Sequence, residues 1–468
     1  MAIRVYNTLT RRHEEFVPLV DGEVKMYVCG PTVYAEFHIG NARVFTVFDA
    51  IRRYLGYRGF KVTYVQNFTD IDDKIINRAQ ALGMHPAALA ELEIGHYFRD
   101  ADTLGIKRAD VHPRATEEIG QIIDLACRLI DAGYAYVAAG DVYFSVNSFR
   151  RYGELSGQDP EQLEAGARVD VTELKRHHLD FALWKAAKPG EPAWPSPWGP
   201  GRPGWHIECS AMARRYLGET IDIHAGGPDL IFPHHENEKA QSEALTGAPF
   251  ARYWLHVGFL SFDGEKMSKS LGNVLTIPQL TQTFDPEAIR FFLLSSHYRS
   301  PLSYSEELLA AAATGLGRLY NAIGTYRQWL TATAKAGADP ADEGIRKRLQ
   351  RYRQRFIEAM DDDFNTADAI AVLFELTRDL NITLTPDSSR DILTVALDLY
   401  AELGGVLGLL GREDGVLGAE VERLLELRQQ ARQARNWAEA DAIRDRLAAQ
   451  GIVLEDTPAG VRWKRAPR

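Results

Sequence analysis

A strand–helix–strand pattern near the start constrains the fold of this chain more than any other feature. Apolar residues alternate with other residues over 24–28, and this pattern ends at Cys29. Apolar residues then recur at helical spacing over 44–55 until Gly56, and residues 61–66 predict a second strand. Such a unit packs as a parallel sheet, and its ligand lies beyond the carboxyl ends of the strands. The sequence therefore predicts an α/β fold, with Cys29 close to its site.

The pattern changes several times along the rest of the chain. Residues 101–183 predict a largely helical region, interrupted by a hairpin at about 134–146. The Pro-, Gly- and Trp-rich stretch at 188–205 fits an active-site loop or lid, and it also fits an inert linker. Long helical patterns fill 286–410. The chain ends in a helix at 438–449 followed by two short strands.

Composition excludes several classes of protein. The 468 residues are 45% hydrophobic and 25% charged, which excludes disorder throughout the chain. The net charge of −10 excludes a generally basic coat, so any RNA contact must come from local patches. Three cysteines cannot form a disulfide framework, which indicates a reducing compartment. The start lacks a signal-peptide pattern and no long apolar run is present, so we expect a cytoplasmic protein.

Residues 38–41, His-Ile-Gly-Asn, lie where the first loop meets the first long helix. A helix N-terminus offers free N–H groups and the positive end of a dipole, which both suit phosphate. Gly40 lets the backbone approach a ligand, and His38 and Asn41 face the same way on a helical turn. These two side chains could donate to the same phosphoryl oxygens. A plain helix cap is the alternative interpretation.

Lys266 and Lys269 lie three residues apart in a polar loop, with Ser268 between them. Two ammonium groups at this spacing could form a movable clamp for pyrophosphate. A solvated basic loop would show the same pattern.

Cys29, Cys209, His234 and Glu238 are candidate metal ligands. Cys29 ends a strand, Cys209 is expected to begin a helix, and the other two lie one helical turn apart. Thiolate, imidazole and carboxylate all bind zinc, and these four side chains would fill a tetrahedral site. No CxxC pair is present, so spacing alone leaves apolar packing of the cysteines as the alternative.

Weaker candidates lie elsewhere in the sequence. Gly227 permits close approach to a nucleotide and Asp229 can accept from ribose hydroxyls, although both also suit a turn. Thr69 is either a substrate contact or the cap of a helix. The basic stretches at 346–355 and 462–468 could contact RNA, or could simply be solvated.

Taken together, residues 38–41 and 266–270 resemble the HIGH and KMSKS signatures of class I aminoacyl-tRNA synthetases. The sequence is most similar to the cysteinyl-tRNA synthetases. That similarity covers nearly the whole chain, and its further motifs lie at 26–34, 68–75, 204–212, 232–238 and 361–366. Asn41 replaces the final His of the general class pattern, and an amide still donates a neutral hydrogen bond.

The resemblance implies a cysteine–tRNA ligase. Such an enzyme activates L-cysteine with ATP and Mg²⁺ to cysteinyl-adenylate and pyrophosphate, then transfers cysteine to the terminal adenosine of tRNA(Cys). It implies one zinc ion per chain, which recognises the thiolate of the substrate without an editing domain. Two rivals are an ATP-dependent cysteine:amino-sugar ligase and a non-catalytic tRNA-binding paralogue. The basic C-terminal region argues against the first rival and the intact motifs against the second.

The resemblance also assigns roles to individual residues. It implies catalytic roles for His38, Asn41, Lys266 and Lys269, and metal binding by Cys29, Cys209, His234 and Glu238. It implies ATP contacts from Thr32, His38, Gly40, Asn41, Gly227, Asp229 and Lys269, and substrate contacts from Trp205 and Thr69.

We expect five regions in a monomeric protein. These are a Rossmann-like catalytic domain (1–100 and 200–255), an inserted connective region (101–199), a KMSKS and stem-contact region (256–313), a helical bundle (314–405) and a small mixed α/β anticodon-binding domain (406–468).

Overall fold

The computed structural model describes residues 2–159, 174–262, 265–266, 275–335, 337, 339–412, 419–449, 452–457 and 460–465. The chain forms two compact units. Unit 1 contains residues 1–277, 298–303 and 361–364, and unit 2 contains residues 278–297, 304–360 and 365–468.

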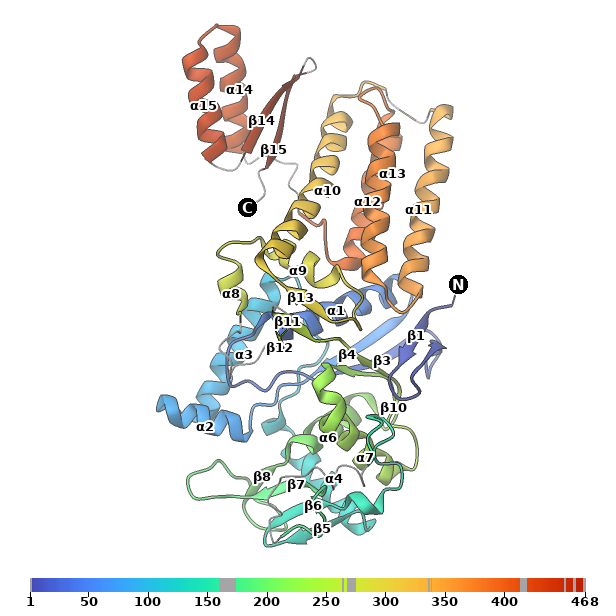
Figure 1. Ribbon diagram of the computed structural model, residues 1–468, viewed down its shortest axis with the longest axis vertical. Helices are drawn as coiled ribbons and strands as arrows, with labels where there is room; N and C mark the ends of the chain where they lie inside the picture. Colours follow the sequence, from blue (N-terminus) through green and yellow to red (C-terminus); the bar gives the residue numbers. More distant parts are fainter. Residues whose placement is uncertain are drawn as a thin grey trace. The chain divides into compact units, whose positions relative to one another are not determined.

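A four-stranded parallel sheet forms the centre of unit 1 (Figure 1). Its strands, in spatial order, are β10 (Ala251–His256), β9 (Ile221–Gly226), β3 (Glu23–Val28) and β4 (Lys61–Gln66). The inner strand β9 is buried at every position, as expected for a strand covered on both faces. The sheet predicted from residues 24–66 is confirmed, and Cys29 follows directly after β3.

Helices pack against this sheet through apolar faces. Helix α1 packs against β4, and its buried Phe45, Phe48 and Ile51 recur at helical spacing. Helix α6 contacts β3 and β4. The longer helices around the sheet are α1 (Ile39–Tyr57), α2 (Asp73–Leu82), α3 (Pro86–Thr103), α6 (Trp205–Leu217) and α7 (Glu236–Thr246).

The insertion between β4 and α6 differs from the prediction. We expected residues 101–183 to be largely helical, but α4 (Ile119–Asp131) is the one long helix that begins among the described residues of this range. The insertion instead forms an antiparallel sheet of β5 (Ala135–Ala138), β6 (Asp141–Phe144), β7 (Phe181–Ala186) and β8 (Gly201–Pro203). Its first two strands confirm the hairpin predicted at about 134–146. Tertiary pairing between separated segments decided this region, and periodicity within each segment does not reveal such pairing.

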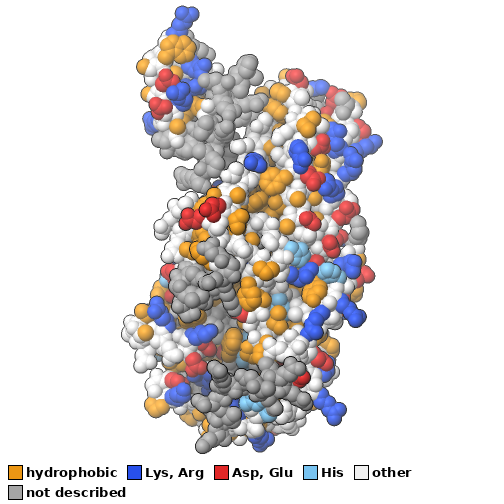
Figure 2. All heavy atoms as spheres, viewed as in Figure 1, with side chains coloured by type: hydrophobic (Ala, Val, Ile, Leu, Met, Phe, Trp, Pro, Cys, Tyr) orange, Lys and Arg blue, Asp and Glu red, His pale blue; other side chains and the backbone are white. Residues whose placement is uncertain are grey.

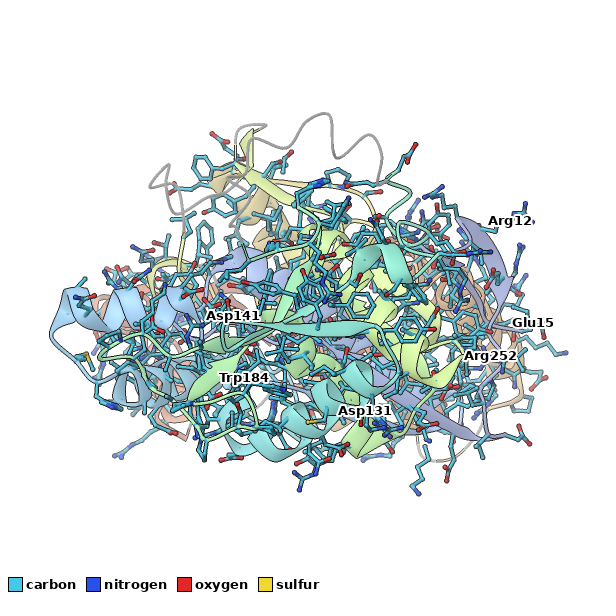
Figure 3. All side chains as sticks on the ribbon, turned by 90° about the horizontal axis from the view of Figure 1, so that it is seen from below. Arg12, Glu15, Asp131, Asp141, Trp184 and Arg252 are labelled. Carbon is cyan, nitrogen blue, oxygen red and sulfur yellow. The ribbon has the colours of Figure 1, made fainter. Side chains whose placement is uncertain are left out.

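The Pro-, Gly- and Trp-rich stretch is folded onto that sheet. Trp194 and Gly201 exchange both backbone hydrogen bonds, at 2.7 and 3.0 Å between N and O. Trp184 is fully buried, and Asp141 accepts a hydrogen bond from the backbone N–H of Ala186 at 2.7 Å (Figure 3). The stretch is therefore part of the insertion, and the inert-linker alternative does not apply.

Several short strands of unit 1 were not predicted. They are β1 (Arg4–Asn7), β2 (Arg12–Glu15), β11 (Leu260–Phe262), β12 (Glu265–Lys266) and β13 (Leu302–Tyr304), the last of which ends at the boundary with unit 2. The buried Arg43 on α1 donates to the backbone oxygens of Gly258, Phe259 and Ser300. Arg43 thereby fixes the segment after β10 against the start of α1.

Unit 2 is mainly helical, as predicted for residues 286–410. Its bundle contains α9 (Pro286–Leu294), α10 (Glu306–Ala332), α11 (Glu343–Asp361, ending in unit 1), α12 (Thr366–Thr383) and α13 (Arg390–Leu407), preceded by the short α8 (Ile277–Leu280). The C-terminal segment contains α14 (Ala419–Gln433), α15 (Trp437–Ala449) and a hairpin of β14 (Ile452–Thr457) and β15 (Gly460–Arg465). None of the described helices is both long and apolar enough to cross a membrane.

Gly30 provides a test of how closely the segment after β3 packs. A Cβ atom at Gly30 would lie 1.6 Å from the backbone oxygen of Asn67, whereas a Cβ at Gly56 in α1 meets nothing within 4 Å. We expect Gly30→Ala to destabilise the protein by roughly 2–4 kcal/mol in urea unfolding, because the backbone must shift. The control Gly56→Ala should stabilise it by up to about 1 kcal/mol. Equal unfolding midpoints for the two variants would contradict this packing.

Candidate active site and metal centre

A pocket of about 310 Å³ opens at the carboxyl ends of the sheet strands. It is lined by the loop after β3, the start of α1, the segment after β9 and the start of α6. Most of the predicted site residues line it, namely Cys29, Thr32, His38, Gly40, Asn41, Thr69, Trp205, Cys209, Gly227, Asp229 and His234. Glu238 lies behind His234. The side chain of Lys266 and all of Lys269 fall outside the described residues.

Two thiols, one imidazole and one carboxylate meet at one side of this pocket. Each of Cys29, Cys209, His234 and Glu238 offers one ligand atom, and these four atoms lie within 4.8 Å of one another. Nε2 of His234 lies 2.9 Å from Oε1 of Glu238, and Sγ of Cys29 lies 3.4 Å from the same oxygen. All four side chains are buried. Tetrahedral zinc bonds of about 2.0–2.3 Å place ligand atoms roughly 3–4 Å apart, so this group fits a zinc ion.

Separate elements of the fold bring these four residues together. Cys29 follows β3, and Cys209 lies in the second turn of α6 rather than at its start. His234 lies in the helical turn η4 (Ile231–His235) that leads into α7, and Glu238 lies in the first turn of α7. The two elements that carry the cysteines, β3 and α6, are far apart in sequence. Folding of the sheet therefore brings the four ligands together.

The electrostatics of the group favour a cation. Burial raises the pKa of Cys209, but hydrogen bonds with Cys29 and His234 outweigh burial and bring this pKa to about 6. Burial and the neighbouring Cys209 raise the pKa of Cys29. The pKa of Glu238 is lowered despite burial, because His224 and His234 both contact its carboxylate. The lowered pKa values of Cys209 and Glu238 favour a thiolate and a carboxylate, and both are good donors to a divalent metal.

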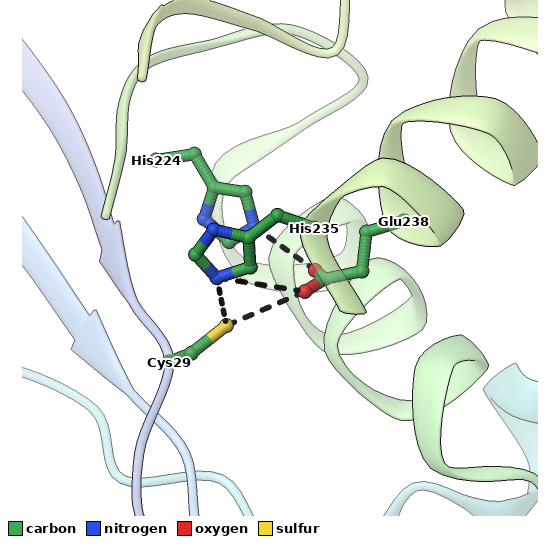
Figure 4. A group of neighbouring side chains, drawn as sticks. All are labelled: Cys29, His224, His235 and Glu238. Atoms are coloured by element: carbon green, nitrogen blue, oxygen red, sulfur yellow. Dashed lines mark hydrogen bonds and ion pairs between the residues drawn. The ribbon is translucent and has the colours of Figure 1, made fainter. Parts of the chain in front are cut away.

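Further histidines lie behind these candidate ligands (Figure 4). Nε2 of His224, on β9, lies 3.0 Å from Oε2 of Glu238, which leaves Oε1 directed at His234 and Cys29. Nε2 of His235 lies 3.3 Å from Sγ of Cys29. The ligand atoms of Cys29, His224, His235 and Glu238 also lie within 4.8 Å of one another.

The histidines continue in two directions from this group. Nδ1 of His235 lies 2.8 Å from Nε2 of His256, whose Nδ1 lies 2.8 Å from Oγ1 of Thr8. Nδ1 of His206 lies 3.0 Å from Nδ1 of His234. Groups behind metal ligands orient the ligands and set their basicity. Sequence reasoning gave these histidines no role in the site, because their contacts are made between separate elements of the fold.

The start of α1 faces the pocket. His38 is the N-cap of this helix, and its Nδ1 accepts a hydrogen bond from the backbone N–H of Asn41 at 3.3 Å. His38 therefore caps the helix, as the alternative interpretation predicted. It also lines the pocket. The first turn carries no acidic side chain, so the positive end of the helix dipole can meet an anion.

The segment after β9 contributes Gly227 and Asp229 to the pocket. A Cβ atom at Gly227 would lie 2.7 Å from Oδ1 of Asp229, so glycine makes room for this carboxylate. Asp229 lies in the short turn η3 (Pro228–Leu230) after β9. Thr32 pairs with Thr69 through a backbone bridge between the two loops that follow β3 and β4.

Trp205 and Thr69 lie beside the candidate metal ligands. The Trp205 ring stacks on His234, with 4.4 Å between ring centroids and 24° between ring planes. Oγ1 of Thr69 donates to Oε2 of the buried Glu208 at 3.0 Å. The capping alternative for Thr69 is wrong, because Asp72 caps α2.

The basic run on α11 is paired within unit 2. Its cations contact carboxylates on α11, α12 and α13: Arg346 with Asp391, Lys347 with Glu343, Arg348 with Asp379, Arg353 with Glu402 and Arg355 with Glu375. Blue and red side chains lie intermixed over the surface (Figure 2). The structure thus favours the alternative of a solvated, internally paired helix face for this run.

The profile of class I (C) tRNA synthetase catalytic domains matches residues 15–314. A DALR domain profile matches residues 355–411, and the profile of cysteinyl-tRNA ligase anticodon-binding domains matches residues 414–463. The chain belongs to the cysteinyl-tRNA synthetase family. The cysteine–tRNA ligase of Symbiobacterium thermophilum is 56% identical over 471 aligned residues, which cover 100% of both chains.

Solved structures of more distant class I synthetases share the fold predicted for this family. The methionyl-tRNA synthetase of Mycobacterium tuberculosis, in complex with methionyl-adenylate, superposes with a TM-score of 0.60 at 18% identity, covering 82% of this chain and 89% of that one. The LeuRS of Agrobacterium radiobacter, in a ternary complex, gives a TM-score of 0.62 at 13% identity, with 84% and 85% coverage. The predicted Rossmann-like fold class is confirmed.

The histidines behind the ligands lead to a prediction about metal affinity. Replacement of His224 by Gln should lower zinc affinity about 10–100-fold, because the carboxylate of Glu238 loses the group that orients it. Competition with a zinc-chelating dye measures this affinity without reference to activity. The control is His85→Asn, at the exposed cap of α3, which keeps an N-cap acceptor and should bind zinc as the parent does. Unchanged affinity in His224→Gln would contradict the proposed orientation.

Proposed function

We propose that this chain is a cytoplasmic, monomeric cysteine–tRNA ligase. It activates L-cysteine with ATP and Mg²⁺, forming cysteinyl-adenylate and pyrophosphate, and transfers cysteine to the terminal adenosine of tRNA(Cys). The observation that carries this proposal is the buried thiol, imidazole and carboxylate group beside the pocket of a chain that belongs to this family. The match of residues 414–463 to an anticodon-binding domain supports tRNA as the acceptor over an amino sugar.

In this proposal Cys29, Cys209, His234 and Glu238 hold one zinc ion. Zinc supplies a Lewis acid that binds a thiolate far better than the harder serine hydroxyl. The chain's own contribution is to keep the donor set buried and its carboxylate oriented. Trp205, stacked on His234, limits the space beside this group to a small side chain. Thr69, held by Glu208, contributes a hydroxyl at the same wall.

In the first step an oxygen of the cysteine carboxylate attacks the α-phosphorus of ATP. A new oxygen–phosphorus bond forms, the bond to the bridging oxygen breaks, and pyrophosphate leaves with that electron pair. No protein nucleophile is needed, so positioning and charge stabilisation supply the catalysis. The side chains of His38 and Asn41, at the positive end of the α1 dipole, would bind the phosphates on one side. Lys266 and Lys269 would stabilise the charge that develops on pyrophosphate.

The nucleotide would lie between the start of α1 and the segment after β9. Gly40 and Gly227 allow its phosphates and ribose to approach the backbone, and Asp229 would accept from the ribose hydroxyls. Thr32 lines the same pocket and completes the proposed ATP contacts. In the second step a ribose hydroxyl of the tRNA attacks the cysteinyl carbonyl carbon, and AMP leaves.

Transfer of labelled cysteine onto bulk tRNA tests the function directly. We expect ATP-dependent, acid-precipitable cysteine in the RNA fraction and no serine under the same conditions. Cysteine-dependent pyrophosphate release without any labelled RNA would contradict the tRNA assignment and favour the amino-sugar ligase.

Zinc removal tests the proposed role of the metal in selecting cysteine over serine. After chelation we expect cysteine-dependent ATP–pyrophosphate exchange to fall at least 100-fold and to recover when zinc is added back, because selection of a thiol over a hydroxyl requires the metal. The low exchange rate with serine should change little. Discrimination between cysteine and serine that survives complete zinc removal would contradict this role.

A further inference from the structure

Lys74 lies at the mouth of the pocket and has no role in the chemistry described so far. It belongs to the first turn of α2, beyond the carboxyl end of β4, and its side chain is exposed. Its Nζ lies 5.7 Å from the ring centroid of Tyr34 and 5.9 Å from that of Trp205. Both rings are half-buried and line the pocket. The ammonium thus stands over two aromatic faces at the entrance.

The carboxylates near this entrance are committed to other partners. Asp73 pairs with Lys185, at 2.6 Å, and with Arg202. Asp72 caps α2, accepting from the backbone N–H of Lys74 at 2.8 Å. Across the pocket, Oε2 of Glu93 lies 3.2 Å from Nδ1 of His96.

No hydrogen bond or ion pair joins the ammonium of Lys74 to any part of the chain that the structure describes. An unpaired cation at the entrance of a pocket attracts an anionic ligand, and its field extends about 8–10 Å into solvent at physiological salt. In a chain of net charge −10 such a cation offers one of the local contacts that RNA requires.

The position of Lys74 favours RNA over cysteine or ATP as the source of the anion. The Trp205 ring stacks on His234, one of the candidate metal ligands, whereas the ammonium of Lys74 lies 5.9 Å from the centroid of the same ring and is exposed. The proposed nucleotide contacts, His38 and Asp229, come from other elements of the pocket wall. A cation beside aromatic faces is the arrangement that binds single-stranded nucleic acid, through phosphate contact and base stacking.

We propose that Lys74 binds a backbone phosphate of the single-stranded 3′ end of tRNA as that end enters the pocket. The half-buried rings of Tyr34 and Trp205, which line the pocket, offer surfaces to its bases. This proposal rests on the function proposed above, and it assigns Lys74 to the transfer step rather than to activation.

The test compares the two steps in Lys74→Met, which keeps most of the apolar stem and removes the charge. We expect cysteine-dependent ATP–pyrophosphate exchange within twofold of the parent enzyme. We expect kcat/KM for tRNA charging to fall about tenfold or more, mainly through KM. The slope of log(kcat/KM) against log salt should flatten by about 0.7, the value for one phosphate contact on a single strand. Lys74→Arg, which keeps the charge, should recover most of the loss.

Lys61→Met is the matched control. Lys61 begins β4, the same strand whose far end leads to Lys74, and it is exposed and 3.5 Å from Glu23. This variant should charge tRNA as the parent does.

Two results would overturn the proposal. Equal losses of exchange and charging in Lys74→Met would place Lys74 against cysteine or ATP, and unchanged charging would remove it from the reaction. Absence of cysteine-dependent exchange in the parent protein would instead contradict the function on which the proposal rests.

Discussion

The burial of the Glu238 carboxylate is the constraint on which the catalytic unit depends. A carboxylate removed from water costs several kcal/mol unless its oxygens are paired, and here both oxygens meet imidazoles. One imidazole, from His224, comes from β9, and the other, from His234, comes from the turn before α7. Tyr27 of β3 pairs in register with His224, so the registers of two strands are linked to the position of this carboxylate. The group of ligands is therefore preformed by the pairing of the sheet.

This arrangement divides the pocket into a dry part and an open part. Behind the ligands the chain from His235 to His256 and Thr8 is polar but hydrogen-bonded, so it can be buried without large cost. In front of them Trp205 covers His234. Electrostatic attraction is strongest where water is excluded, which suits selection of a thiolate. The proposed phosphate contacts, His38 and Asn41, are half-buried, so their part of the pocket is more accessible to a larger ligand.

The sequence predicted those elements whose periodicity is strong, and it missed those that depend on partners. Residues 24–66 show clear strand and helix periods, and their sheet formed as expected. Strand β2 (Arg12–Glu15) is polar and exposed along most of its length, so no alternation marks it. The insertion contains strands that exist because β6 and β7 pair across a long separation. Local pattern carries no information about such pairing.

The candidate site shows the same division. Spacing alone did not predict that Cys29 and Cys209 would meet, and only the resemblance to a family placed them together. His224 and His235 carry no signal in sequence, because a histidine in a strand or helix is ambiguous until its neighbours are known. For the basic run of α11 the sequence left RNA contact and a solvated helix face both open. Its arginines pair with carboxylates of α12 and α13, and these partners are far away in sequence.

The ion pairs on α11 affect where tRNA could bind, and the choice between cysteine and serine does not depend on that binding. RNA bound there would have to compete with ion pairs that each contribute up to about 1 kcal/mol, so that surface offers little net attraction. Choice of the amino acid needs no contribution from RNA either, since a buried metal-binding group can distinguish a thiol from a hydroxyl before tRNA arrives. The 3′ end then requires only enough attraction at the entrance to reach the adenylate. In the role proposed for Lys74, a single ammonium near two aromatic rings would supply this weak attraction and would still allow the charged tRNA to dissociate.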